Sequence, residues 1–145
     1  MTESSILQQI QGTWILESIY YKNSENIKID YYGPNPKGIL MYDQFGFMNA
    51  QLGFSDRSQL KKMNPEDDKL KISSYDTYMA YYGRYYEQEL GVIIHDVIGC
   101  TQPAWVGEKI IRYVKTENNI LYITTPETII NNTKTRLEVY WSKAK

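Results

Sequence analysis

The sequence predicts a mainly all-β fold: an eight-stranded antiparallel β-barrel with one helix inserted across the barrel end. Two observations predict it. Runs with an apolar or aromatic residue at every second position, typical of half-buried strands, recur along most of the chain. Short stretches of turn residues separate these runs, so successive strands are expected to pair antiparallel, and eight strands suffice to close a barrel around one small ligand.

The length indicates one unit. With 145 residues the chain can bury a sizeable core without disulfides or structural metals. We therefore expect a single domain over residues 1–145.

The first part of the chain predicts three strands. Residues 3–11 are expected to form one or two helical turns. Residues 13–21 follow as a strand rich in β-branched and aromatic residues, and residues 27–32 are compatible with a short further strand. Residues 37–54 predict a hairpin, with Gly46 available for a positive φ at its turn.

One long helix is expected over residues 66–82. Pro65 and the three acidic residues that follow it suit a first helical turn, and Gly83 suits the left-handed residue at the end. Three tyrosines recur on this helix at helical spacing and are expected to pack against the barrel mouth: Tyr75, Tyr78 and Tyr82. Five strands are expected after it, at residues 84–89, 92–99, 109–115, 119–125 and 134–141.

Composition and charge exclude several classes of protein. The net charge is −1 and the 16 basic residues are scattered, so we expect no nucleic-acid partner. The apolar runs are far shorter than the roughly 20 residues of a spanning helix, so we expect no membrane partner. Because the N-terminus lacks a secretory pattern and Cys100 is alone, a cytoplasmic location is expected. One histidine and one cysteine make a metal site a poor prospect, and we expect no cofactor.

A family resemblance runs from Gly12 to Trp141. The succession GTW, PKGILMYDQFGFMNAQL, YMAYYGRY, VIIHDV, PAWVG, Arg112, LYITTP and LEVYW resembles the bacterial lipocalin-like domain family. The resemblance implies a small lipocalin-like β-barrel with a helix across one end. Many relatives carry two adjacent histidines where this chain has His95 and Asp96, so a mechanism that requires a histidine pair loses support.

The family pattern and the residue types together select the candidate site. We expect a ligand to be bound by Tyr42, Gln51, Tyr81, Tyr85, His95, Trp105 and Arg112. His95 shares a strand face with Ile93 and Val97, which points it into the barrel, as a hydrogen-bonded core residue or as a ligand-binding or proton-transferring group.

The aromatic and basic residues near His95 are assigned to the inner or outer face of the barrel. Tyr85 is expected inside with Tyr81 above it on the helix, whereas Tyr86 faces out. Trp105 either plugs the barrel or caps its opening. We expect Arg112 to face inward, and the side of Arg84 is left open.

Three functions fit these residues. The leading interpretation is binding of a small, mainly apolar organic molecule inside the barrel. The alternative is a cofactor-free cyclase or isomerase acting on a polyketide- or terpenoid-like substrate, a role that some lipocalin-like barrels have in natural-product pathways. Its catalytic candidates are His95, Tyr85 and Arg112. A third reading, haem binding through His95, ranks last.

Overall fold

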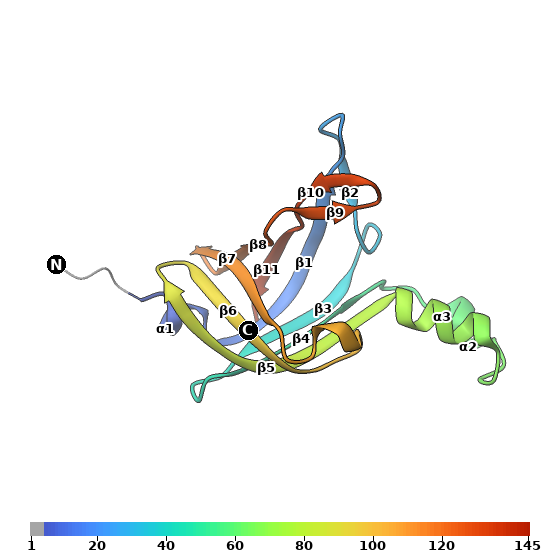
Figure 1. Ribbon diagram of the computed structural model, residues 1–145, viewed down its shortest axis with the longest axis horizontal. Coiled ribbons are helices and arrows are strands. Elements are labelled where there is room, and N and C mark those ends of the chain that lie inside the picture. Colours follow the sequence, from blue (N-terminus) through green and yellow to red (C-terminus); the bar gives the residue numbers. More distant parts are fainter. Residues whose placement is uncertain (1–4) are drawn as a thin grey trace.

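The structure, a computed structural model, describes residues 5–145 and confirms the eight-stranded antiparallel barrel (Figure 1). Its strands are β1 (Gly12–Lys22), β3 (Lys37–Tyr42), β4 (Phe47–Gly53), β5 (Tyr78–Glu89), β6 (Val92–Cys100), β7 (Lys109–Glu117), β8 (Ile120–Thr124) and β11 (Glu138–Lys143). They pair in this order around the ring, and β11 pairs with β1 to close it. Closure leaves no free sheet edge within the ring.

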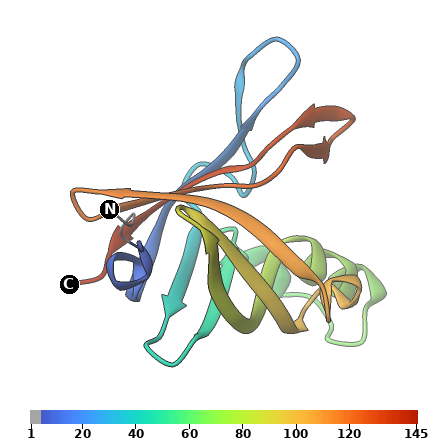
Figure 2. The ribbon, with the colours of Figure 1, turned by 60° about the vertical axis from the view of Figure 1, so that its left-hand side comes forward.

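Three short strands lie outside the ring. Strand β2 (Lys28–Asp30) pairs with the far end of β1, while β9 (Thr128–Ile130) and β10 (Thr133–Thr135) form a separate hairpin. Figure 2 shows this hairpin and the β1–β2 connection extending beyond the barrel.

The single strand expected over residues 134–141 is therefore wrong. The chain reverses direction at Asn131 and Asn132, which form a two-residue hairpin turn with positive φ values of 48° and 64°. This turn directs residues 133–135 back onto β9, and the chain joins the barrel only at Glu138.

The N-terminal helix closes one end of the barrel. Helix α1 (Leu7–Ile10) lies within the expected segment 3–11, of which residues 3 and 4 fall outside the described residues. Ile10 is fully buried, and its carbonyl accepts a hydrogen bond of 2.8 Å from the indole nitrogen of Trp14. This end of the barrel is therefore filled by side chains.

The long helix expected over residues 66–82 is wrong at both ends. Helix α3 covers only Asp68–Asp76, follows the short helix α2 (Ser58–Lys61), and has no buried residue. Residues from Tyr78 onward belong to β5, where Met79 pairs with Leu52 and Tyr81 pairs with Ala50. Pairing on both sides satisfies the backbone of this segment, which outweighs its helical spacing.

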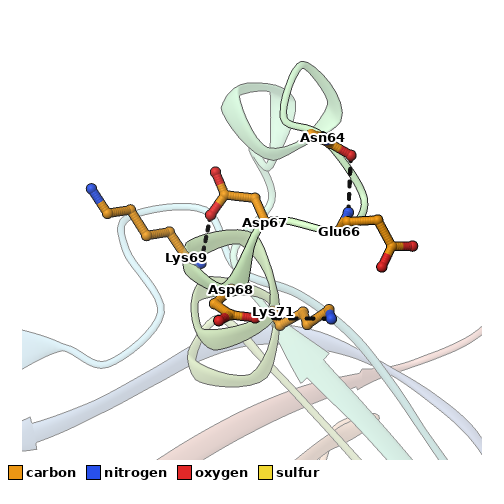
Figure 3. Close-up of polar contacts among 6 residues, drawn as sticks. All are labelled: Asn64, Glu66, Asp67, Asp68, Lys69 and Lys71. Atoms are coloured by element: carbon orange, nitrogen blue, oxygen red, sulfur yellow. Dashed lines mark hydrogen bonds and ion pairs between the residues drawn. The ribbon is translucent and has the colours of Figure 1, made fainter.

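The start of α3 is determined by side chains that accept backbone N–H groups (Figure 3). The Asp67 carboxylate accepts from the backbone of Lys69 at 2.8 Å, and Asn64 accepts from the backbone of Glu66 at 3.0 Å. Asp67 is thus the N-cap, which places the first helical residue at Asp68. The exposed Asp68–Lys71 ion pair adds little stability.

Strand β5 alternates strictly between the two faces of the sheet. Tyr81, Gly83 and Tyr85 are buried, whereas Tyr82 and Tyr86 are 51% and 44% exposed. Tyr85 therefore faces inward as predicted, but Tyr81 does so from a strand rather than from a helix.

The three tyrosines expected at the barrel mouth do not pack there together. Tyr75 is half exposed on α3, and Tyr82 lies on the outer face. Tyr78 donates a hydrogen bond to Gln51 on the outer side of the sheet. Arg84, whose side was left open, also lies outside, over the ring of Phe47 at 4.2 Å.

Across residues 5–145, none of the helices has both the length and the apolar character needed to cross a membrane.

Gly83 should be intolerant of any side chain. A Cβ there would run into the backbone of Asp96 and Val97, at the point where the β5–β6 pairing is irregular. We expect Gly83→Ala to lower the free energy of unfolding in urea by about 1–3 kcal/mol. Gly107→Asn is the control, since that glycine has open space around it and a φ of 86° that Asn accepts. Equal stability of the two variants would contradict this close approach.

Candidate functional site

A cavity of about 600 Å³ occupies the half of the barrel opposite α1. Strands from around the ring contribute apolar side chains to its wall, among them Ile19, Leu40, Leu52, Met79, Ile123 and Val139. Exposed and half-exposed residues from the β2–β3 connection and from the β9 region, including Tyr31, Glu127 and Ile129, form its rim. The projecting hairpin seen in Figure 2 is thus part of the cavity mouth.

The other half of the barrel is solid. Trp14, Tyr42, Ile93 and Leu121 are each at most 1% exposed and pack in one continuous core. Tyr85 belongs to this core as well, with its ring 4.7 Å from that of Tyr42. These side chains form the floor beneath the cavity.

His95 lies where the solid half meets the hollow half. It lines the cavity yet is only 1% exposed. Its Nε2 atom lies 2.7 Å from the hydroxyl of Tyr42, and its Nδ1 atom lies 2.8 Å from the hydroxyl of Tyr81. Tyr42 comes from β3, Tyr81 from β5 and His95 from β6, so three strands converge on one imidazole.

Arg112 and Trp105 complete the polar part of the wall. Arg112 faces inward from β7, opposite Ile93 of β6, and lines the cavity. Its guanidinium lies 5.9 Å from the ring of Trp105, within cation–π range. Trp105 ends the 3₁₀ helix η1 (Pro103–Trp105) and packs edge-to-face on Tyr81.

A comparison with protein-family models identifies the scaffold. The model described as lipocalin-like domain matches residues 11–144. The chain belongs to the lipocalin-like domain family. No curated protein sequence matches it.

Burial keeps the polar cluster of this lipocalin-like domain uncharged apart from Arg112. Burial lowers the pKa of His95 well below its usual value, and the positive charge of Arg112 lowers it further. Burial also raises the pKa of Tyr42 well above its usual value. The pKa of Tyr81 is raised by burial as well, although the positive charge of the nearby Arg112 opposes the rise. A neutral imidazole between two neutral phenols follows.

The structure brings together four of the seven residues predicted to bind ligand. Tyr81, His95, Trp105 and Arg112 all line the cavity.

The other three predicted residues lie elsewhere. Tyr42 is on the side of His95 away from the cavity, and Tyr85 donates a hydrogen bond of 2.5 Å to the carbonyl of Asp43 within the floor. Gln51 is exposed on the outer face of β4, because Ala50 and Leu52 on either side of it point inward. Its expected place inside the barrel is therefore wrong.

The sequence reasoning missed the rim of the cavity. Thr128, Ile129 and Ile130 line the mouth, although the sequence predicts no strand between residues 125 and 134. The Asn131–Asn132 pair was the available signal, because two consecutive asparagines favour the turn of a tight hairpin.

Haem binding through His95 has no support in this geometry. Axial ligation needs a free imidazole nitrogen, and tyrosine hydroxyls occupy both nitrogens of His95.

The neutral state of His95 predicts a pH dependence of stability. Below the ordinary histidine pKa of about 6.5, the unfolded chain binds a proton on His95 that the folded protein excludes. The free energy of unfolding should therefore fall as pH falls from about 7 to 5.5, with a His95 contribution approaching about 1.4 kcal/mol per pH unit. His95→Gln should be less stable at neutral pH yet lack this contribution. Urea titrations across this range measure both slopes, and parallel slopes would contradict a neutral buried imidazole.

Proposed function

We propose that this lipocalin-like domain binds a small, mainly apolar organic molecule that carries a few oxygen functions. The observation that supports this most strongly is a largely apolar cavity of about 600 Å³ whose wall also carries the polar groups of Tyr81, His95 and Arg112. Pockets that hold small organic ligands usually measure roughly 300–1,000 Å³ and combine apolar walls with a few placed polar groups.

The two kinds of wall have different roles in this proposal. The apolar side chains of β1, β3, β4, β5, β8 and β11 supply affinity, since each apolar Å² removed from water contributes roughly 25 cal/mol. Tyr81 and Arg112 supply orientation, because a ligand that buries them without offering an acceptor leaves their donors unsatisfied.

A cofactor-free cyclase or isomerase is the second candidate, and one observation favours it. Tyr81 and Arg112 both lie against the ring of Trp105 at the cavity wall, where a phenol and a guanidinium are two donors able to polarise one carbonyl group of a bound substrate. The shape of the cavity would hold a flexible polyketide- or terpenoid-like chain in a folded conformation. Tyr85 is not a catalytic candidate at this wall, because its hydroxyl donates to the carbonyl of Asp43 in the floor.

Filling the cavity should weaken binding without unfolding the barrel. Ala50 lines the cavity and Gln51, the next residue of β4, faces solvent, so the pair gives a matched test. We expect Ala50→Leu to weaken binding of the neutral fluorophore N-phenylnaphthylamine by roughly fivefold or more, since overpacking costs about 1–3 kcal/mol. Gln51→Leu should bind it as the wild type does. Failure of the folded wild type to bind it, or equal binding by both variants, would overturn the proposed cavity.

Turnover separates the two candidate functions. If the domain is an enzyme, Tyr81→Phe should lower kcat by roughly 10²–10⁴-fold, because a donor that acts in the transition state is lost. The dissociation constant of the substrate should change far less. Candidate polyenes or polyketides incubated with the protein and followed by mass spectrometry give both quantities. A product that forms equally fast with Tyr81→Phe would remove the enzymatic reading at this site.

A further inference from the structure

The hydrogen bonds through His95 have a direction. A neutral imidazole carries one N–H donor and one acceptor nitrogen. Since both nitrogens face tyrosine hydroxyls, one tyrosine must donate to His95 and the other must accept from it. Which one donates decides what the cavity offers to a ligand.

Tyr42 is the donor. It is 1% exposed, lies below the cavity, and among residues 5–145 its hydroxyl has His95 as its single hydrogen-bond partner. If Tyr42 accepted from His95, its own O–H would be buried without an acceptor, at a cost of about 1–3 kcal/mol. Donating to Nε2 removes this cost, and the imidazole hydrogen then sits on Nδ1.

Tyr81 accepts as a consequence. Its oxygen receives the Nδ1–H of His95, and its ring packs on Trp105, over which the guanidinium of Arg112 also lies. Its own O–H is left for an acceptor, and because Tyr81 lines the cavity, that acceptor is a water or a ligand atom. Tyr42 thus donates to His95, His95 donates to Tyr81, and the Tyr81 hydroxyl donates into the cavity.

Arg112 indicates which charge the acceptor group of the ligand carries. Within the part of the chain that the structure describes, the ion pairs are Asp68–Lys71 and Asp96–Lys109, and neither involves Arg112. One guanidinium nitrogen donates to the carbonyl of Ile111, which leaves further N–H donors at the wall. A partly buried cation facing an apolar cavity is stabilised most by an anionic partner.

We propose that the natural ligand is an apolar molecule bearing a carboxylate, whose oxygens accept from Tyr81 Oη and from the Arg112 guanidinium. Tyr42 is a positioning residue in this account, because it orients the donors through His95 without contacting the ligand. This proposal rests on the function proposed above and adds the charge of the ligand. Arg112 repels an apolar amine of the same size. An ester binds in the same cavity without the ionic contact.

Three probes of one chain length test the charge: decanoate, methyl decanoate and decylamine, measured by displacement of N-phenylnaphthylamine near pH 7.5. We expect decanoate to bind roughly 10- to 100-fold more tightly than the ester, and the amine to bind least. Arg112→Met should reduce decanoate to the affinity of the ester and leave the ester unchanged. Arg84→Met, which removes an arginine from the outer face, should leave all three affinities unchanged.

The single histidine makes the direction of the hydrogen bonds directly observable. In uniformly ¹⁵N-labelled protein, one imidazole contributes to the long-range ¹H–¹⁵N spectrum, and we expect the hydrogen on Nδ1. Tyr42→Phe removes the donor to Nε2, so the hydrogen should shift toward Nε2. The decanoate affinity should then fall by several fold and that of the ester by less, because a hydrogen bond to a carboxylate is stronger than one to an ester carbonyl; loss of packing alone would lower both equally.

The outcomes distinguish this inference from the proposed function. If decanoate and its ester bind equally, or if His95 carries its hydrogen on Nε2 in the wild type, the carboxylate proposal is wrong although the cavity still binds. If neither probe nor the fluorophore binds to the folded protein, the proposed function itself fails.

Discussion

The pair of hydrogen bonds that holds His95 between Tyr42 and Tyr81 is the constraint on which the rest of the structure depends. Strand side chains alternate between the two faces of a sheet, so slipping β3, β5 or β6 by one residue would turn its member of the cluster to the outside. A slip of β3 or β5 would leave one imidazole nitrogen of His95 buried without its partner, and a slip of β6 would leave both tyrosine hydroxyls without theirs. The cluster therefore favours a single register across β3–β6, and the same register places Arg112 of β7 on the inner face.

This cluster also marks the boundary between two halves with different roles. Below it, α1, Trp14 and Tyr42 fill the barrel to the density of an ordinary core. Above it, apolar walls enclose a hollow whose rim comes from short elements outside the ring. A solid half gives stability, which allows the other half to stay hollow. The neutral side chains of Tyr81 and His95 and the charged Arg112 then add polar groups to the wall of this hollow.

Much of the fold was predictable, because alternation and turn residues locate most of the ring strands; the exceptions are the first half of β5 and the boundaries of β11. The interior position of His95 followed from its apolar neighbours Ile93 and Val97 in the same way. The helix expected over residues 66–82 is wrong for a physical reason. Tyr75, Tyr78 and Tyr82 recur at a spacing that suits a helix face, and only the pairing of residues 78–84 with β4 decides for a strand. Local pattern carries no information about that partner.

The site was harder to predict than the fold. Arg112 and Tyr81 were predicted from the family resemblance, and both line the cavity. Gln51 was placed inside by the same resemblance, although its position in β4 between the inward Ala50 and Leu52 puts it outside. The sequence does not predict that Tyr42 and Tyr85 lie in the floor and not at the cavity. Alternation distinguishes inward from outward residues but does not show which inward residues face a hollow.

Neutron diffraction from deuterium-exchanged crystals would test the central claim most directly, because it locates the hydrogens that decide the direction of the cluster. The account predicts a deuteron on Nδ1 of His95, the Tyr42 deuteron directed to Nε2, and the Tyr81 deuteron pointing into an open cavity toward a water or ligand oxygen. A deuteron on Nε2, or a barrel whose upper half is filled by its own side chains, would contradict it.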